Sequence, residues 1–252
     1  MPPGPITPQR SGGASRGSGT RLSGRVVGRG PGRSLTRSSL GEDGQVPQSY
    51  LTVASPVDVE IEVRRSRFLA RLEPAADEAA ARLVVEQARK AHWDARHHCS
   101  AFVLGPDAMT ERSSDDGEPA GTAGAPMLEV LRGRGLSDVV CVVTRWFGGT
   151  LLGTGGLIRA YGDSVRAACD AATVVERRLV QRFSLEVEHA DAGRVEAALR
   201  ARGVHVAGTD YAARAVLRLD VAPPQREDLA ALVAELTGGA GQLLDGPTRW
   251  HP

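Results

Sequence analysis

The stretch VVTRWFGGTLLGTGGLIRAY, residues 142–161, contains five glycines in the nine positions from Gly148 to Gly156. The apolar run before the glycines is typical of a buried strand, and the segment after them has the spacing of an amphipathic helix. A glycine loop before a helix leaves backbone N–H groups free at the positive end of the helix dipole, where an anion can bind. The sequence therefore predicts a strand, a glycine loop and a helix, with the loop as a candidate binding site.

A second motif, DDGEPAGTAG at residues 115–124, places the carboxylates of Asp115, Asp116 and Glu118 in one loop. Its proline and glycines prevent a helix there. These carboxylates suit general acid–base catalysis or Mg²⁺ binding, and His98 lies close enough in the sequence to join a catalytic set. The other interpretation is structural, since Asp-Gly and Glu-Pro-x-Gly form turns and Asp side chains accept hydrogen bonds from nearby N–H groups. The sequence leaves both interpretations open.

Together the two motifs resemble those of the YigZ/Impact family, DDGEPxGTAG followed by VVTRYFGGxKLGxGGLxRAY. The segment SRF at residues 66–68 and the pair His98-Cys99 support the resemblance, which runs from about Tyr50 to the C-terminus. Leu151 stands where such proteins usually carry lysine, and Trp146 where tyrosine is more usual. The lost cation weakens the expected grip on phosphate.

The resemblance implies a fold and a function. The first domain is expected to be similar to domain IV of elongation factor G, with its ribosomal-protein-like fold, and the second to domain V. The expected function is non-enzymatic and translation-linked, through binding of RNA, the ribosome or a translation protein. A small hydrolase or anion-binding enzyme that uses the acidic loop and the glycine loop is the alternative.

The predicted binding residues are the loop glycines and the two arginines that flank the loop: Arg145, Gly148, Gly149, Gly153, Gly155, Gly156 and Arg159. Two arginines at the mouth of the loop would hold a phosphate or carboxylate in bidentate fashion. Alternatively, Arg159 pairs with Asp163, and Arg145 with Asp115 or Asp116. The five glycines would then serve backbone conformations with positive φ and close packing of strand against helix.

No cofactor or metal is expected. The loop is not a Walker A motif, because Thr154 follows Gly153 where lysine is required, and it is not a dinucleotide motif, because Ile158 replaces the third glycine. Three widely spaced cysteines without a CxxC pair argue against a zinc site and a disulfide framework. Cys99 is expected to be a buried small hydrophobe, and Trp93 a packing residue at a helix end.

Residues 1–48 form a basic tail with seven arginines, two acids and no hydrophobic periodicity, a composition typical of disorder. The tail is interpreted either as an arm that contacts RNA or as the product of a wrongly assigned start upstream of Val46. The sequence lacks an apolar run of about 20 residues and an apolar signal segment, which predicts a cytoplasmic protein without a membrane partner. The rest of the chain is mildly acidic, so no DNA partner is expected.

Two domains are predicted, residues 49–179 and 180–252, in an α+β or α/β chain. The second reads as β-α-β-β-α-β, the order of a ferredoxin-like domain. In the first, Pro74 is expected to open a helix, and ion pairs at i,i+4 are expected on the helix after the glycine loop, Arg159–Asp163 and Arg166–Asp170. The predicted strands and helices of the first domain are Val57–Arg64, Phe68–Leu72, Ser100–Leu104, Pro126–Leu131, Val139–Thr144 and the helix around Leu157.

Overall fold

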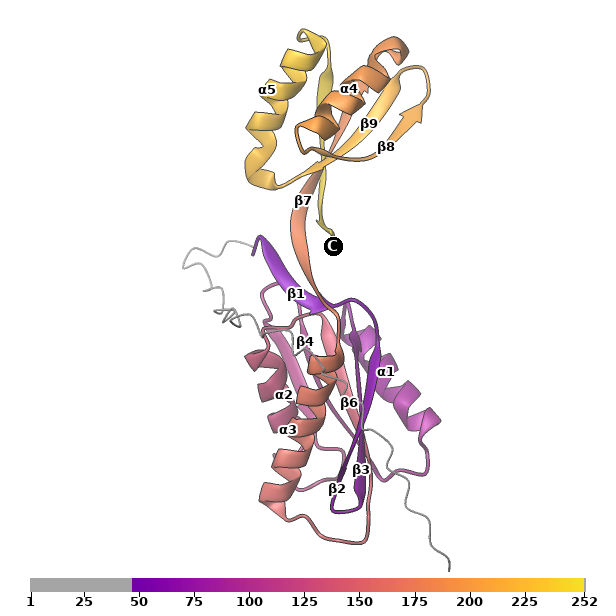
Figure 1. The fold of residues 1–252 in the computed structure, drawn as a ribbon, viewed down its shortest axis with the longest axis vertical. Helices are drawn as coiled ribbons and strands as arrows, with labels where there is room; N and C mark the ends of the chain where they lie inside the picture. Colours follow the sequence, from indigo (N-terminus) through magenta and orange to yellow (C-terminus); the bar gives the residue numbers. More distant parts are fainter. Residues whose placement is uncertain (1–46, 252) are drawn as a thin grey trace, which may run out of the picture. The chain divides into compact units, whose positions relative to one another are not determined.

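The computed structural model describes residues 47–251 of the 252-residue chain. Nearly all of the predicted basic tail, residues 1–46, lies outside the described residues. Within the described part, five α-helices and two antiparallel sheets form a mixed α and β fold, as the sequence predicts (Figure 1).

The first sheet holds both sequence motifs near its edges and ends. Its outermost strand alternates apolar and charged residues, as a half-buried strand does, whereas its central strands are apolar almost throughout. All neighbouring strands are antiparallel. Their order across the sheet is β2 (Val57–Val63), β3 (Ser66–Pro74), β6 (Val139–Trp146), β4 (His97–Leu104) and β5 (Thr110–Ser114).

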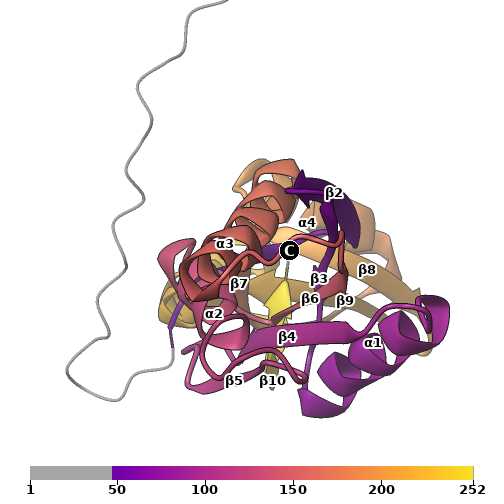
Figure 2. The same cartoon turned by 90° about the horizontal axis from the view of Figure 1, so that it is seen from below.

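Helices cover both faces of this sheet, which explains why its central strands are apolar on both sides (Figure 2). Cys141 and Val143 of β6 face α2 (Gly124–Gly133) and α3 (Thr154–Ala171). The alternate residues Val140 and Val142 face α1 (Glu78–Ala91). Each large apolar side chain buried in these cores contributes about 1.5–3 kcal/mol to stability.

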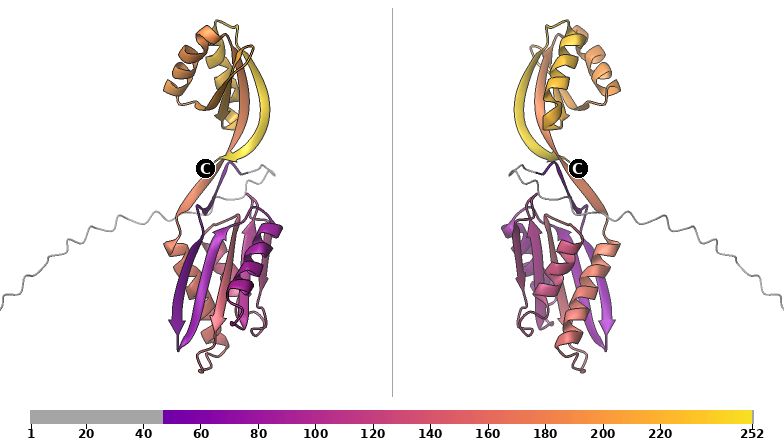
Figure 3. Two further views of the ribbon diagram at one scale, coloured as in Figure 1. Left: turned by 90° about the vertical axis from the view of Figure 1, so that its right-hand side faces the viewer. Right: turned by 90° about the vertical axis from the view of Figure 1, so that its left-hand side faces the viewer.

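The second sheet contains the element order β-α-β-β-α-β that the sequence predicts (Figure 3). Its helices α4 (His189–Ala201) and α5 (Arg226–Thr237) pack on one apolar core. The division into domains at residue 180 stays a prediction, because β7 is continuous across that position. The strands are β10 (Gln242–His251), β7 (Val174–Val187), β9 (Ala215–Val221) and β8 (His205–Tyr211) in spatial order, with β1 (Ser49–Val53) also paired to β7.

One predicted helix start is wrong. Pro74 does not open a helix but ends β3, and α1 begins at Glu78, where the Asp77 side chain accepts a hydrogen bond from the N–H of Ala80. Strands β1 and β5 were not predicted from the sequence.

The ion pairs predicted on α3 also differ from those observed. Arg166 pairs with Asp163 at i,i+3, and Asp170 pairs with Arg134 of the loop after α2. Among the described residues, Arg159 has no ion pair. The i,i+3 and i,i+4 spacings bring side chains equally close on a helix, so the sequence spacing does not decide between them.

The turn between β2 and β3 holds an unusual backbone. Val63 pairs with Ser66, which leaves a two-residue turn made of Arg64 and Arg65, with φ of 48° and 67°. Two-residue hairpins of this kind need positive φ at both positions, which Asn and Gly adopt readily and arginine does not. Holding other residues there costs of the order of 1–3 kcal/mol each.

The glycine loop packs directly on this turn. A Cβ on Gly148 would lie 2.0 Å from the carbonyl carbon of Arg65, so only glycine fits there. The N–H of Gly148 also donates to Ser66 Oγ at 3.1 Å. Positive φ occurs at Gly149 and Gly153.

Three of the five loop glycines, Gly148, Gly155 and Gly156, do not have the predicted positive φ. Gly155 and Gly156 belong to the first turn of α3, and neither has positive φ. A Cβ at Gly155 would meet nothing within 4 Å. The backbone requirement therefore lies at the start of the loop and at the helix cap, and not inside the helix.

These positions predict opposite effects of the same substitution. Gly148→Ala should destabilise the fold by at least about 1–3 kcal/mol, because the added methyl group displaces the backbone of Arg65. Gly155→Ala should stabilise it by up to about 1 kcal/mol, because alanine is the better helix former. Urea denaturation of the two variants checks this, and equal midpoints would contradict the interlocking of loop and turn.

Candidate functional site

Asp115 is a structural residue of the acidic loop. Its carboxylate accepts hydrogen bonds from the backbone N–H groups of Gly121, Ala123 and Gly124, at 2.8, 3.0 and 2.8 Å. Burial alone would raise the pKa of Asp115, but these three hydrogen bonds lower it below its usual value. The carboxylate thus satisfies N–H groups at the start of α2 that have no partner within the helix.

Asp116 joins the loop to two neighbouring elements. One carboxylate oxygen accepts from Arg89 of α1 at 2.7 Å, and the other accepts from the backbone N–H of His98 at 2.7 Å. The Asp116 carbonyl oxygen lies 2.9 Å from His97 Nδ1. Asp116 therefore holds the start of β4 against the end of α1.

Glu118 lies at the centre of a buried polar cluster. Its Oε1 accepts hydrogen bonds from Arg145 of β6 at 2.6 Å and from Tyr161 of α3 at 2.7 Å. The side chains of Glu118 and Arg145 are only 3% and 8% exposed. Arg145 thus forms the predicted ion pair with the acidic loop, but its partner is Glu118 and not Asp115 or Asp116.

The thiol of Cys99 borders this cluster and is not reactive. Its Sγ lies 3.0 Å from the carbonyl oxygen of Asp115 and 3.3 Å from Tyr161 Oη. Burial raises the pKa of Cys99 to about 12 and also raises the pKa of Tyr161. Both groups stay protonated at neutral pH, so Cys99 supplies no thiolate, in line with the prediction of a buried small hydrophobe.

His98 is buried as well, and burial lowers its pKa. Its Nε2 lies 3.1 Å from the carbonyl oxygen of His92. The catalytic alternative requires Asp115, Asp116 and Glu118 to converge unpaired in a cleft, and each of them is instead engaged in internal hydrogen bonds. Residues 47–251 contain no group of three or more His, Cys, Asp and Glu side chains able to hold a metal ion.

Exposed groups gather around the glycine loop instead. Phe147 and Leu151 are 50% and 82% exposed. No side chain caps the first turn of α3, which begins at Thr154 directly after the loop. Exposed apolar and cationic side chains beside uncapped N–H groups are suited to an anionic partner with apolar parts.

The two arginines predicted to flank the loop mouth do not come together. Arg145 is turned into the core, where it contacts Glu118, and Arg159 is exposed on α3, on the side away from the buried Leu157 and Tyr161. Only Arg159 is accessible to a ligand. The exposed turn Arg64–Arg65 lies against the loop, although Arg64 was predicted to be the last residue of a strand.

The sequence pattern does indicate this turn. The alternating run of β2 stops at Val63, and a second strand begins two residues later at Ser66. Two short strands separated by two residues predict a hairpin. The Arg-Arg pair at its tip is unlike the usual Asn-Gly, and this difference marks the turn as a candidate site.

Trp93 is not a packing residue as predicted, since 82% of it is exposed. Its two neighbours contact Trp146 instead. The ring centroids of His92 and Trp146 are 5.4 Å apart, and the indole N–H of Trp146 donates to Asp94 Oδ2 at 2.8 Å. Trp146 and Arg145 are consecutive in β6 and point to opposite faces of the sheet. Trp93 thus lies on the α1 side, away from Arg145.

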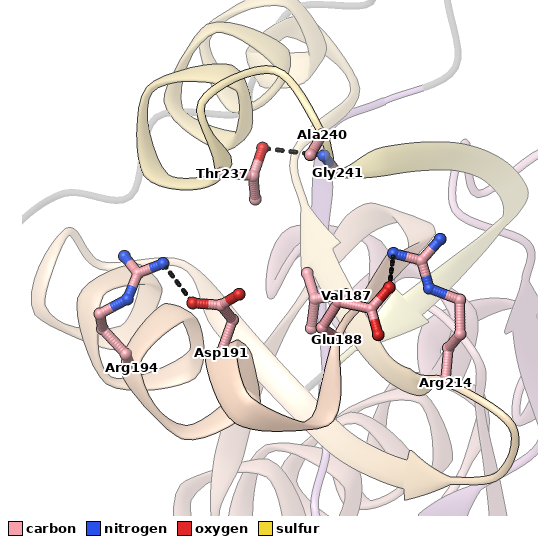
Figure 4. A pocket seen from close by; sticks show the side chains of 8 residues that line it. All are labelled: Val187, Glu188, Asp191, Arg194, Arg214, Thr237, Ala240 and Gly241. Atoms are coloured by element: carbon pink, nitrogen blue, oxygen red, sulfur yellow. Dashed lines mark hydrogen bonds and ion pairs between the residues drawn. The ribbon is translucent and has the colours of Figure 1, made fainter.

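A small pocket in the second sheet's domain offers no alternative site. Figure 4 shows Arg194 facing Asp191, and Arg214 facing Glu188, around its rim. The cavity is about 60 Å³, the volume of roughly two waters, and cofactor sites are several times larger. Its arginines are already paired with acids.

The role of Asp115 predicts how stability depends on pH. Because its pKa is lower in the folded chain than in the unfolded one, Asp115 stabilises the fold above its unfolded-chain pKa of about 3.9. This contribution disappears as the pH falls through the lower folded value. Asp115→Asn should cost about 1–3 kcal/mol at neutral pH and flatten the loss of stability in acid. Denaturation from pH 7 to pH 3 measures both effects, and an unchanged acid limb would contradict the capping role.

The buried pair predicts a double-mutant result. Arg145→Met or Glu118→Leu alone should destabilise the fold by about 3–5 kcal/mol, because each leaves a buried partner without its counter-charge. Arg145→Met combined with Glu118→Leu should recover much of this loss, since no buried charge remains. Losses in the double variant equal to the sum of the two single losses would contradict a direct pair.

Comparisons with known proteins find similar domains and relatives. The Impact N-terminal domain model matches residues 64–169, and a domain of unknown function, DUF1949, matches residues 185–240. The IMPACT family member YvyE of Bacillus subtilis is 38% identical over 198 residues, covering 79% of this chain and 91% of that one. The IMPACT family member YigZ of Escherichia coli is 40% identical over 199 residues, covering 78% and 98%.

A solved structure is also similar. A crystal structure described as that of an hypothetical protein has a TM-score of 0.56 and 38% identity, and the match covers 80% of this chain and 98% of the other. In the described part of the chain, no helix is long and apolar enough to cross a membrane.

Proposed function

Since the chain belongs to the IMPACT family, we propose that it is a non-enzymatic, translation-linked regulator that binds RNA, free or within the ribosome. We place its RNA contacts at the end of the first sheet where the glycine loop meets the β2–β3 turn. The expected similarity of its two domains to domains IV and V of elongation factor G, and a cytoplasmic location, belong to the same proposal.

One observation carries the choice of binding over catalysis. The carboxylates that could act in catalysis all accept hydrogen bonds from other groups of the chain. Asp115, Asp116 and Glu118 each accept two or more. By contrast, Arg159 and the Arg64–Arg65 turn have no carboxylate partner in the described part of the chain. Accessible cations without acids are available to phosphates.

The same geometry predicts weak binding. An RNA-binding protein gains affinity by releasing the counterions that each neutralised phosphate had condensed, and this gain falls as salt rises. Few exposed arginines surround the glycine loop, so few counterions are released. Leu151 at the loop tip adds no charge. Binding should therefore be modest and lost at high salt.

Arg159 and Leu151 supply the test. Arg159→Glu should weaken binding of a labelled RNA by about tenfold at low salt, and Leu151→Lys should strengthen it, because the first reverses and the second adds a contact with phosphate. Arg166→Glu makes the same charge change on α3 but at an arginine already paired with Asp163, and should have a smaller effect. Fluorescence anisotropy at several salt concentrations measures all three.

Capture from lysate with and without RNase extends this test. Ribosomal RNA or ribosomal proteins should accompany the full chain and be lost with Arg159→Glu. If the purified chain binds no RNA at low salt and captures no ribosomal material, the proposed function is wrong.

A further inference from the structure

The Arg64–Arg65 turn combines backbone strain with unpaired charge. Both residues hold positive φ in a two-residue hairpin, a conformation that arginine rarely adopts. Strained backbone of this kind persists where the surrounding structure enforces it and is found mainly at functional sites. The turn therefore needs a reason beyond the hairpin itself.

The charge of the turn is exceptional among the described residues. Eighteen of the 23 arginines of residues 47–251 form an ion pair with a carboxylate. Two of the exceptions are adjacent in this one turn, although like charges at such a distance repel. The arginines of the described part without such a partner are Arg64, Arg65, Arg96, Arg159 and Arg177.

Contacts with the glycine loop hold the turn in place. Gly148 touches the Arg65 backbone, and Arg65 Nη2 donates to Thr150 Oγ1 at 3.1 Å. The guanidinium of Arg65 is thus held beside the loop. Figure 1 shows the β2–β3 turn and the connection from β6 to α3 at the same end of the sheet.

Phe147 adds an aromatic group to these cations. It directly precedes Gly148, is 50% exposed, and its ring centroid lies 5.9 Å from the guanidinium carbon of Arg145. Arg145 is fixed by Glu118, so the ring packs against a rigid support. An exposed aromatic ring beside arginines is the combination that binds unpaired bases together with their phosphates.

The strand state of the RNA follows from this combination. In an A-form duplex the bases are stacked and the major groove is too deep and narrow for side chains to read. A ring on a short loop then reaches no base face, and Phe147 would contribute nothing. In a single strand, a base can leave the stack and lie on the ring.

We propose that the Arg64–Arg65 turn and Phe147 form a binding site for single-stranded RNA, in which the two arginines contact phosphates and Phe147 stacks on a base. This inference rests on the proposed function and adds to it the residues and the strand state of the ligand. The strained turn fixes the backbone of both arginines against Gly148, the residue after Phe147, and Thr150 holds the Arg65 guanidinium beside the loop.

The experiment uses the full chain and fluorescence anisotropy at about 50 mM salt. The probes are a fluorescein-labelled oligouridine of about 12 nucleotides, a duplex RNA of equal length and an acidic Glu-Leu peptide. Arg64→Gln with Arg65→Gln removes both charges, and its control is Arg82→Gln with Arg112→Gln, which removes two exposed arginines that both pair with Glu78.

The oligouridine should bind more tightly than the duplex. Its affinity should fall about tenfold in the Arg64→Gln, Arg65→Gln variant and less than about twofold in the control variant. Phe147→Leu should weaken oligouridine binding about fivefold and leave duplex binding unchanged, whereas Phe147→Trp should retain it. Trp93→Leu, at an exposed aromatic on the other face of the sheet, should have no effect.

A second turn variant separates binding from folding. Arg64→Asn with Arg65→Gly suits positive φ, so it should raise the melting temperature while losing as much oligouridine affinity as the Gln variant. Wild-type affinity in this variant would overturn the proposal.

The remaining outcomes distinguish this inference from the function it rests on. Equal binding of duplex and single strand, with no effect of Phe147→Leu, overturns the single-strand site but leaves RNA binding intact. No binding of either RNA at low salt overturns both. Binding of the acidic peptide alone, lost in the Gln variant, would assign the turn to a protein partner and overturn the RNA site.

Discussion

The fold of the first domain depends on the buried ion pair between Arg145 and Glu118. Removing two charges from water is unfavourable unless their geometry and remaining hydrogen bonds compensate, and here Tyr161 adds a third partner to the same carboxylate. The acidic loop, a central strand and the helix after the glycine loop are therefore joined at one oxygen atom. The DDGE and TRWFGG segments each supply one charge of this pair, and each charge would be buried and unpaired without the other.

The same interaction determines what remains for function. A side chain that forms an ion pair or hydrogen bond within the fold is not available to a ligand. The three carboxylates of the acidic loop, which are the candidates for catalysis, all form such interactions. The accessible groups are of another kind: uncapped N–H groups at α3, an exposed ring at Phe147, and arginines without acidic partners. Such groups bind anions and flat apolar surfaces, and none of them transfers protons at neutral pH. This difference is the basis on which we propose recognition and not catalysis.

Much of the architecture could be predicted from periodicity, because alternation in β2 and the glycine loop before α3 are local signals. The β-α-β-β-α-β order of the second sheet followed from the same patterns. The partner of Arg145 could not be predicted, since three acids within four residues are equally near in sequence and only the path of the loop selects Glu118. The position of Pro74 was predicted wrongly because proline suits both the first turn of a helix and the last residue of a strand, where it ends β3. The Arg64–Arg65 turn was missed because turn propensities favour Asn and Gly.

Strain and charge at that turn also reinforce each other. The backbone strain persists whether or not a ligand is bound, but the repulsion between Arg64 and Arg65 falls once an anion lies between or beside them. Any ligand that binds the folded chain alone stabilises it, and an anion at this turn removes an unfavourable term as well. Gly148 prevents the turn from relaxing, because the loop backbone occupies the space into which Arg65 would move. The glycine motif therefore holds a neighbouring pair of arginines in a backbone conformation that their own sequence disfavours.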